Sequence, residues 1–265
     1  MRQVVIENPV INSPYADPAR HFRFSDEGIT NEIVEARRVS SYFIPIPRPK
    51  KRSPQLSFET EWTQDRIKEN DFINRVRARV ELWRRGGYVG VTKTTARLLQ
   101  YWTNPERERK LFFCQIEALE TAIYLTECAT KQGDAWIANE LQELADEQNP
   151  GLYRTALKMA TGSGKTVVMA MLIAWHTLNK QASSRDARFS DAFLVVTPGI
   201  TIRDRLRVLL PESPDNFYRE RDIVSAADLE RLGQARIAIT NFHSLQLREA
   251  QVASKTTKEI LTRGK

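Results

Sequence analysis

The residue types best suited to chemistry stand together in one stretch, Met159 to Thr166, with the sequence MATGSGKT. Its end matches the G-K-[ST] of a phosphate-binding loop, although Met159 replaces the first glycine of the usual pattern. Gly162 and Gly164 lack a Cβ, so the backbone can curl and point successive N–H groups inward. Lys165 would then reach the β- and γ-phosphates of a nucleotide, and the Thr166 hydroxyl would ligate Mg²⁺. The alternative is a chance glycine turn at the start of a helix.

Such a loop needs a strand before it and a helix after it, and the sequence predicts both. Residues 152–159 are β-prone, and residues 166–179 are apolar on nearly every side, which suits a helix between a sheet and another layer. Further along, strands are expected at 193–197 and 236–240, helices at 200–210 and 226–232, and a loop at 211–222. Strands that alternate with helices predict an α/β fold whose parallel sheet is covered on both faces.

The residues before the loop divide into two regions. Residues 1–60 contain seven of the twelve prolines and are expected to form an irregular N-terminal arm. Residues 61–110 form a basic region with twelve basic and seven acidic side chains, and helices are predicted there at 62–85 and 94–102. Two more helices, at 111–130 and 134–147, would begin the third region, 111–265. The basic cluster at 48–52 could contact phosphates or be a solvated linker.

The composition favours an anionic partner. The net charge is +7 and the pI is near 9.5, so nucleic acid is the first candidate, although a merely soluble basic protein fits as well. Cys114 and Cys128 would stand about 21 Å apart on one helix, too far for a disulfide. Because the sequence shows no secretory leader and no apolar run long enough to span a bilayer, we expect a reducing, cytoplasmic compartment and no membrane partner.

Four stretches, in this order, resemble the superfamily 2 helicases of the DEAD/DEAH type, and most closely the res (motor) subunit of Type III restriction enzymes (ResIII). The first is the loop itself, in which a methionine at the first place is usual for that branch. It implies that Thr161, Gly162, Ser163, Gly164, Lys165 and Thr166 bind ATP and Mg²⁺, with Lys165 and Thr166 in the catalytic role.

The second stretch, residues 113–118 with the sequence FCQIEA, is similar to the Q motif. The resemblance implies that Gln115 reads the adenine edge and that Phe112 or Phe113 stacks on the base. An amide can both donate and accept hydrogen bonds, as adenine requires. An ordinary surface glutamine is the alternative.

The third and fourth stretches, residues 195–206 and 239–243, look like motif Ia and a later motif of the same lobe, both of which grip a nucleic-acid backbone. Hydroxyls, backbone N–H groups and an arginine suit phosphate contacts without base reading. The Thr-Pro-Gly turn could also merely end a strand, and His243 is assigned no acid–base role. The DNA-binding residues implied in this way are Thr197, Pro198, Gly199, Arg203, Thr240 and Asn241.

The resemblance implies an incomplete RecA-like P-loop NTPase lobe, in which a parallel sheet has flanking helices, behind a proline-rich and helical N-terminal region. Residues 7–12 and 61–65 also look like the N-terminal region of a restriction-associated branch. No metal-holding Asp-Glu pair follows Thr166, and Asp146-Glu147 precedes the loop. We therefore expect the N-terminal part of an ATP-dependent DNA helicase or translocase, which alone hydrolyses ATP poorly.

The expected partners are DNA and a modification (methyltransferase) subunit or nuclease domain supplied elsewhere. One alternative function is a non-catalytic DNA-binding or assembly fragment with a vestigial nucleotide site. A different nucleotide hydrolase, such as a small-molecule kinase, stays open on the loop alone.

Overall fold

The computed structural model describes residues 6–25, 28–43 and 67–245, which form a mixed α/β structure that is mostly helical. The strands are β1 (His21–Ser25), β2 (Gly28–Val34), β3 (Ser41–Phe43), β4 (Ile67–Glu69), β5 (Ala192–Thr197) and β6 (Arg236–Asn241). The helices are α1 (Asp71–Arg85), α2 (Lys93–Trp102), α3 (Phe113–Ile123), α4 (Ala135–Gln148), α5 (Lys165–Ala182), α6 (Ile200–Arg205), α7 (Phe217–Glu220) and α8 (Ala226–Leu232).

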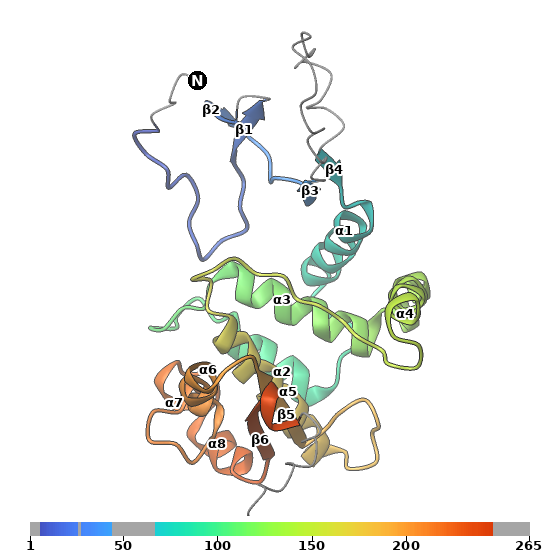
Figure 1. Ribbon diagram of the computed structural model, residues 1–265, viewed down its shortest axis with the longest axis vertical. Helices are drawn as coiled ribbons and strands as arrows, with labels where there is room; N and C mark the ends of the chain where they lie inside the picture. Colours follow the sequence, from blue (N-terminus) through green and yellow to red (C-terminus); the bar gives the residue numbers. More distant parts are fainter. Residues whose placement is uncertain (1–5, 26–27, 44–66, 246–265) are drawn as a thin grey trace, which may run out of the picture.

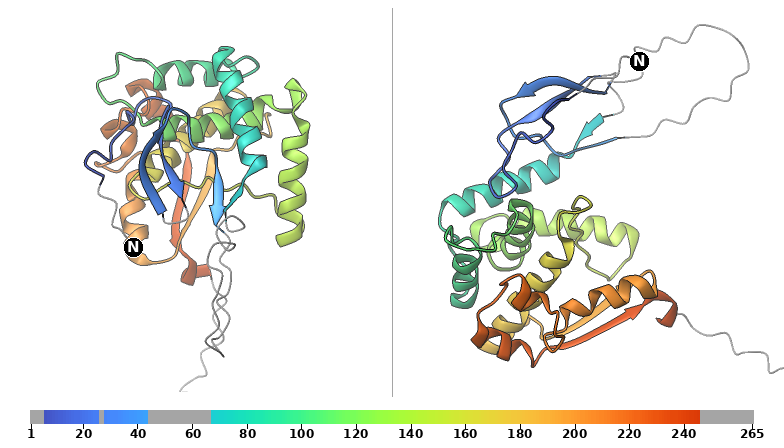
Figure 2. Two further views of the ribbon diagram at one scale, coloured as in Figure 1. Left: turned by 90° about the horizontal axis from the view of Figure 1, so that it is seen from above. Right: turned by 90° about the vertical axis from the view of Figure 1, so that its left-hand side faces the viewer.

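The elements are arranged in tiers along the long axis of the molecule (Figure 1). The antiparallel pairs β1–β2 and β3–β4 occupy one end, and α1 leads from them to the helices in the middle. The parallel pair β5–β6, with α6, α7 and α8 beside it, forms the other end, as the second view in Figure 2 also shows. Helix α5 connects the middle tier to this end, since it contacts α2, α3, α7 and α8.

Helix α5 forms the centre of the core because apolar residues occur all around it. Ala170, Met171, Ala174 and Leu178 are all completely buried, and Trp175 is 1% exposed. The helix was predicted at 166–179; it begins one residue earlier and ends three residues later. A helix that is apolar on every side must be covered on every side, and the contacts with four other helices provide that cover.

A buried carboxylate, Glu127, ties α5 to the helices that precede it. It lies in a π-helical turn, Tyr124–Cys128, and is 2% exposed. Its oxygens accept hydrogen bonds from Thr92 N at 2.7 Å, Thr95 Oγ1 at 2.6 Å and Trp175 Nε1 at 2.9 Å. These donors come from the start of α2 and from the middle of α5. A buried carboxylate with three donors is held firmly, so the group fixes how α2 and α5 meet.

The parallel sheet pairs β5 with β6 in the register Val195↔Ile239. Phe193, Val195 and Ile239 pack against the core, whereas Leu194 is 62% exposed and Val196 is 44% exposed on the opposite face. The prediction that both faces of the sheet are covered is therefore wrong for the described residues. The alternation of side chains along each strand buries only one face.

The predicted strand at 152–159 is also wrong, because this segment is irregular and Leu152, Tyr153 and Leu157 are 56%, 50% and 37% exposed. A β-prone run becomes a strand only when it has a partner, and no described strand pairs with this one.

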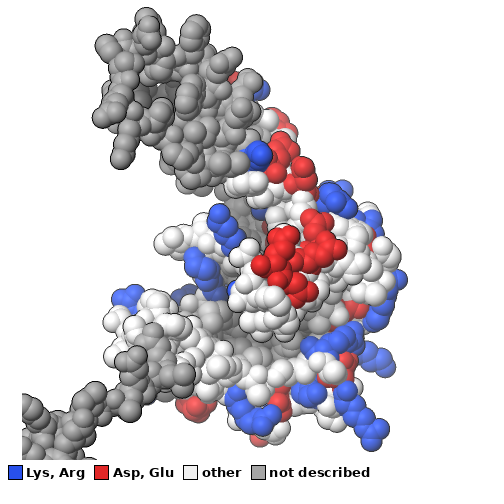
Figure 3. All heavy atoms as spheres, turned by 45° about the vertical axis from the view of Figure 1, so that its right-hand side comes forward, with Lys and Arg blue, Asp and Glu red and all other residues white. Residues whose placement is uncertain are grey.

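Helix α4 lies within one residue of its predicted bounds at both ends. It provides four acidic and no basic side chains, and the acidic side chains form a patch that is visible in Figure 3.

Other boundaries differ for local reasons. The N-terminal arm is not wholly irregular, since it forms β1, β2 and β3. The helix predicted at 62–85 begins only at Asp71, after β4. The helix predicted at 111–130 starts at Phe113 and changes to π-helical geometry after Ile123.

The helix predicted at 200–210 tightens into a 3₁₀ turn from Leu206, and the expected loop at 211–222 contains the short helix α7. The basic cluster at 48–52, residues 61–65 and the tail after Leu245 lie outside the described residues.

His176 on α5 makes the stability of this core sensitive to pH. Its ring contacts Trp175, Phe189 and Phe193, and burial lowers its pKa to about 4. As the pH falls from 6.5 to 4, His176 binds a proton in the unfolded chain but not in the folded chain. The free energy of unfolding should therefore fall by up to about 3 kcal/mol. In urea titrations at several pH values across this range, His176→Leu should make the free energy of unfolding depend less steeply on pH.

Candidate functional site

The glycine loop has the backbone geometry that its sequence predicts. Gly162 and Gly164 have φ angles of +79° and +77°, a region that side chains disfavour. Gly164 directly precedes α5, and no side chain caps the helix there. The first N–H groups of a helix have no acceptor within it, so those of Lys165 and Thr166 are available to an anion. The macrodipole of this helix favours negative charge at the same end.

The Lys165 side chain folds back over the loop. Its Nζ donates to Ala160 O at 2.8 Å and to Met159 O at 3.2 Å, and the Ser163 hydroxyl also donates to Ala160 O, at 2.7 Å. Lys165 is exposed, so a bound anion could replace these carbonyl oxygens without breaking buried contacts. Thr161 and Gly162 are exposed beside it, and Thr166 is half-buried.

Gln115 contacts the loop directly. It is 5% exposed; its Nε2 donates to Ser163 O at 3.0 Å and its Oε1 accepts from Phe112 N at 3.0 Å. A Cβ placed on Gly164 would lie 2.2 Å from this Nε2, so any other residue at this position would force the end of the Gln115 side chain to move. Gln115 is thus a buried bridge between α3 and the loop. One N–H and one lone pair of the amide are left for a ligand.

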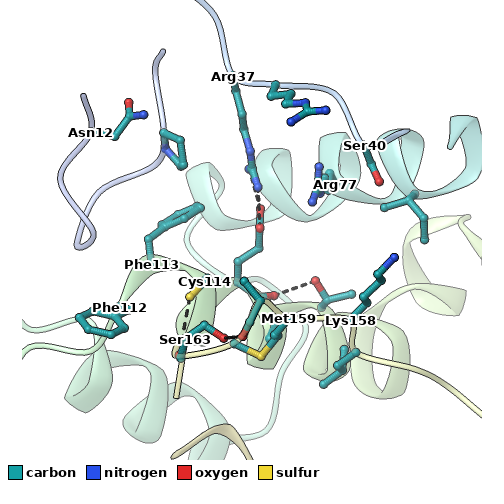
Figure 4. Close-up of a pocket in the computed structure, with 18 of the residues that line it drawn as sticks. Asn12, Arg37, Ser40, Arg77, Phe112, Phe113, Cys114, Lys158, Met159 and Ser163 are labelled. Atoms are coloured by element: carbon teal, nitrogen blue, oxygen red, sulfur yellow. Dashed lines mark hydrogen bonds and ion pairs between the residues drawn. The ribbon is translucent and has the colours of Figure 1, made fainter. Parts of the chain in front are cut away.

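The two candidate aromatic residues lie in different surroundings (Figure 4). The Phe113 ring lies under two guanidinium groups, with the Arg84 and Arg37 carbons 4.9 and 5.5 Å from its centroid. The Phe112 ring is tilted against Tyr15, with the ring centroids 5.7 Å apart, and no cation among the described residues stacks on it. Of the two, Phe112 therefore has the ring face that a base could use.

A bidentate ion pair stands behind Phe113. Arg37 donates to both carboxylate oxygens of Glu117, at 2.6 Å each. This hydrogen bonding raises the pKa of Arg37 despite partial burial. The pair fixes the N-terminal arm against α3, because Arg37 follows β2. The N-terminal arm is thus part of the structure around the loop.

A groove of about 1190 Å³ runs between the N-terminal arm and α1 on one side and α3 and residues 156–163 on the other (Figure 4). We call it the arm groove. The loop residues Thr161 to Ser163 are among those that line it. No pattern in the sequence predicts this groove, because its walls come from segments more than a hundred residues apart in the chain.

The strand-end residues of the two backbone-gripping motifs are brought together. Thr197 and Asn241 are register partners at the carboxyl ends of β5 and β6. Both are buried, and their side chains act locally: Thr197 Oγ1 donates to Gly199 O at 2.9 Å, and Asn241 Oδ1 accepts from Ser244 N at 2.8 Å.

The remaining residues of these motifs are more open. Pro198 is exposed, and Thr240 is half-buried. Arg203 on α6 pairs with Asp204 at 2.9 Å and lines a hollow of about 310 Å³ together with Arg207 and Ile239. Arg203 and Pro198 can therefore meet a ligand, whereas Thr197 and Asn241 shape the turn.

These observations define a mixed α/β protein in which a glycine loop begins a buried helix and parallel strands follow. Residues 108–262 match the family model described as Type III restriction enzyme, res subunit. This match covers more than half of the chain, so the chain belongs to that family. Membership indicates a helicase- or translocase-related function. A search of curated proteins and a search of solved structures each found no match.

Within the described residues, no helix combines the length and hydrophobicity needed to cross a membrane. The same part of the chain contains no cluster of three or more His, Cys, Asp or Glu side chains that could hold a metal ion.

The Gln115 bridge makes the two loop glycines unequal, which a matched pair of substitutions tests. Gly162→Ala should cost only backbone strain, about 1 kcal/mol, since nothing lies within 4 Å of the added Cβ. Gly164→Ala adds the clash with Gln115 and should cost roughly 1–3 kcal/mol more, measured as the free energy of unfolding. Gln115→Ala should recover part of that loss in the double mutant. Equal costs for the two glycines would contradict the bridge.

Proposed function

We propose that the chain is the nucleotide-binding part of an ATP-dependent DNA helicase or translocase of the Type III restriction type. The observation that carries this proposal is the contact between the Gln115 amide and Ser163 of the glycine loop, in a chain of this family. It joins the group proposed to recognise the base to the group proposed to hold the phosphates. The division at residues 60 and 110 stays a prediction.

The residues present fit ATP and Mg²⁺. Gly162 and Gly164 let the loop curl, and the open N-terminus of α5 suits a phosphate. Lys165 would exchange its two carbonyl partners for the β- and γ-phosphates, and the Thr166 hydroxyl would be a Mg²⁺ ligand. Bound Mg²⁺ would neutralise charge on the phosphates. Thr161 and Ser163 line the loop, Gln115 contacts the adenine edge, and Phe112, rather than Phe113, stacks on the base.

DNA would meet the carboxyl ends of β5 and β6. Here Arg203 provides the positive charge, and the turn at Pro198 and Gly199 and the backbone at Thr240 provide polar groups. Contacts of this kind bind phosphates without reading sequence. A second candidate function, a DNA-binding module with a vestigial nucleotide site, is favoured by the way Lys165 occupies its own loop carbonyls.

ATP binding distinguishes the two functions. Lys165→Ala should weaken binding of a fluorescent ATP analogue by roughly a hundredfold, because it removes a charged contact to two phosphates. Lys180→Ala, at the far end of α5, is the matched control and should bind as the wild type does. Equal affinity in wild type and Lys165→Ala would support the vestigial site instead.

The reactivity of Cys114, which lies beside the glycine loop, provides a second measurement of ATP binding. Cys114 is exposed, with its Sγ 4.0 Å from Ser163 O, whereas Cys128 is buried and burial raises its pKa to about 11. A maleimide should therefore label Cys114 first, and ATP should slow that labelling in the wild type but not in Lys165→Ala.

Salt dependence tests the DNA contact. Arg203→Gln should lower the slope of log affinity against log salt by about 0.9 for a DNA duplex, since one phosphate contact is lost. Arg205→Gln, an exposed arginine on the same helix, should leave the slope unchanged. An equal fall in both variants would show that only net charge matters.

A further inference from the structure

The arm groove is strongly basic. The side chains along its wall include one carboxylate, Glu117, and five cations: Arg20, Arg37, Arg38, Arg77 and Lys158. Glu117 already accepts hydrogen bonds from the two terminal guanidinium nitrogens of Arg37. Arg37 also pairs with Asp17 at 3.2 Å, and Arg20 pairs with Glu35 at 3.4 Å. Among the described residues, the lining cations without a carboxylate partner are therefore Arg38, Arg77 and Lys158.

Arg77 is the clearest example of a cation without a carboxylate partner in the described part of this groove. It lies on α1, half-buried, and among the described residues no ion pair or hydrogen bond reaches its guanidinium. The pKa of Arg77 is lowered, first by burial and then by the neighbouring charge of Arg37, and the carboxylates of Glu117 and Asp17 oppose this shift without reversing it. A half-buried cation next to another cation is under-compensated, so an anion placed there would be stabilised.

Lys158 approaches the same place from the other wall. It belongs to the irregular segment just before the glycine loop, and its ammonium group points toward α1, the helix that carries Arg77 (Figure 4). Arg38, on the arm, stacks on Phe24 at 4.2 Å and adds a third cation from a third segment.

We propose that the arm groove binds a single strand of nucleic acid, with Arg77 as the anchoring phosphate contact and Lys158 and Arg38 beside it. The choice of nucleic acid over another polyanion rests on the proposed function. The strand would run along the groove past the glycine loop, on a surface separate from the strand ends of β5 and β6.

The size and lining of the groove favour a strand over a single nucleotide. Its volume of about 1190 Å³ exceeds the upper end of ordinary small-ligand pockets, about 1,000 Å³. Its cations are interleaved with exposed apolar side chains, of which Val39 is 50% exposed, Ile73 40% and Leu157 37%. A positively charged groove that follows the backbone is one of the two usual parts of a single-strand site, the other being aromatic side chains on which the bases stack.

The test is fluorescence anisotropy with fluorescein-labelled dT12 and the full chain, over a series of salt concentrations. Arg77→Gln should weaken binding about tenfold and lower the salt slope by about 0.7, the loss of one single-strand phosphate contact. Arg77→Lys should keep most of the slope. Lys158→Gln should also lower the salt slope. Because Lys158 is exposed and lies outside α1, this result does not depend on whether α1 tolerates a substitution.

Arg85→Gln is the matched control, because Arg85 is an exposed arginine at the end of the same helix and pairs with Glu81. It should leave the slope unchanged. The proposal is overturned if Arg85→Gln acts like Arg77→Gln, or if the wild type does not bind dT12 at low salt. It is also overturned if only Arg203→Gln weakens binding, a result that leaves the proposed function intact. Loss of ATP binding in Lys165→Ala with dT12 binding retained supports strand binding that does not need the contact of Lys165 with phosphate.

Discussion

The buried carboxylate of Glu127 is the interaction on which the arrangement of the site depends. Its three donors belong to the start of α2 and to α5, so one group sets where α5 lies relative to the helices before it. The glycine loop is the N-terminal extension of α5, and its position follows from that packing. Gln115 then fixes the other side of the loop to α3. Removing the Glu127 carboxylate would take the acceptor from Thr92 N, and removing the Gln115 amide would leave Phe112 N and Ser163 O without this partner. An unpaired polar group costs more than the bond itself contributes.

Local signals in the sequence predicted local structure well. Helix α2, helix α8 and strands β5 and β6 were predicted to within one residue at each end, because apolar periodicity and turn residues mark them. The β1–β2 hairpin was missed: Phe24, Ile29 and Ile33 remain partly exposed on it, so its alternation is not driven by burial. Residues 152–159 show the opposite case. Their strand propensity needs a pairing partner, and propensity alone does not provide one.

The site was predicted in part, and the limits have the same physical origin. The conformation of Gly162 and Gly164 follows from their residue type. The choice between Phe112 and Phe113 does not, because Arg37 and Arg84 reach Phe113 from distant parts of the chain. Thr197 and Asn241 have side chains that suit phosphate contacts, yet parallel pairing turns both inward, where they hold the strand ends together. Residue type indicates what a group can do, and tertiary packing decides whether a ligand can reach it.

The glycine loop belongs to two surfaces at once. Thr161 to Ser163 are among the residues that line the arm groove, and Ala160 O accepts hydrogen bonds from both Lys165 and Ser163. If a bound triphosphate draws the Lys165 ammonium group away from Ala160 O, the electrostatic potential at the edge of the groove becomes less positive. A strand in the groove would then bind the nucleotide-loaded chain less tightly than the free one. Linkage makes the effect reciprocal, so the strand would oppose nucleotide binding by the same factor. If the proposed function and the groove site both hold, this geometry therefore predicts that nucleotide and strand weaken each other's binding.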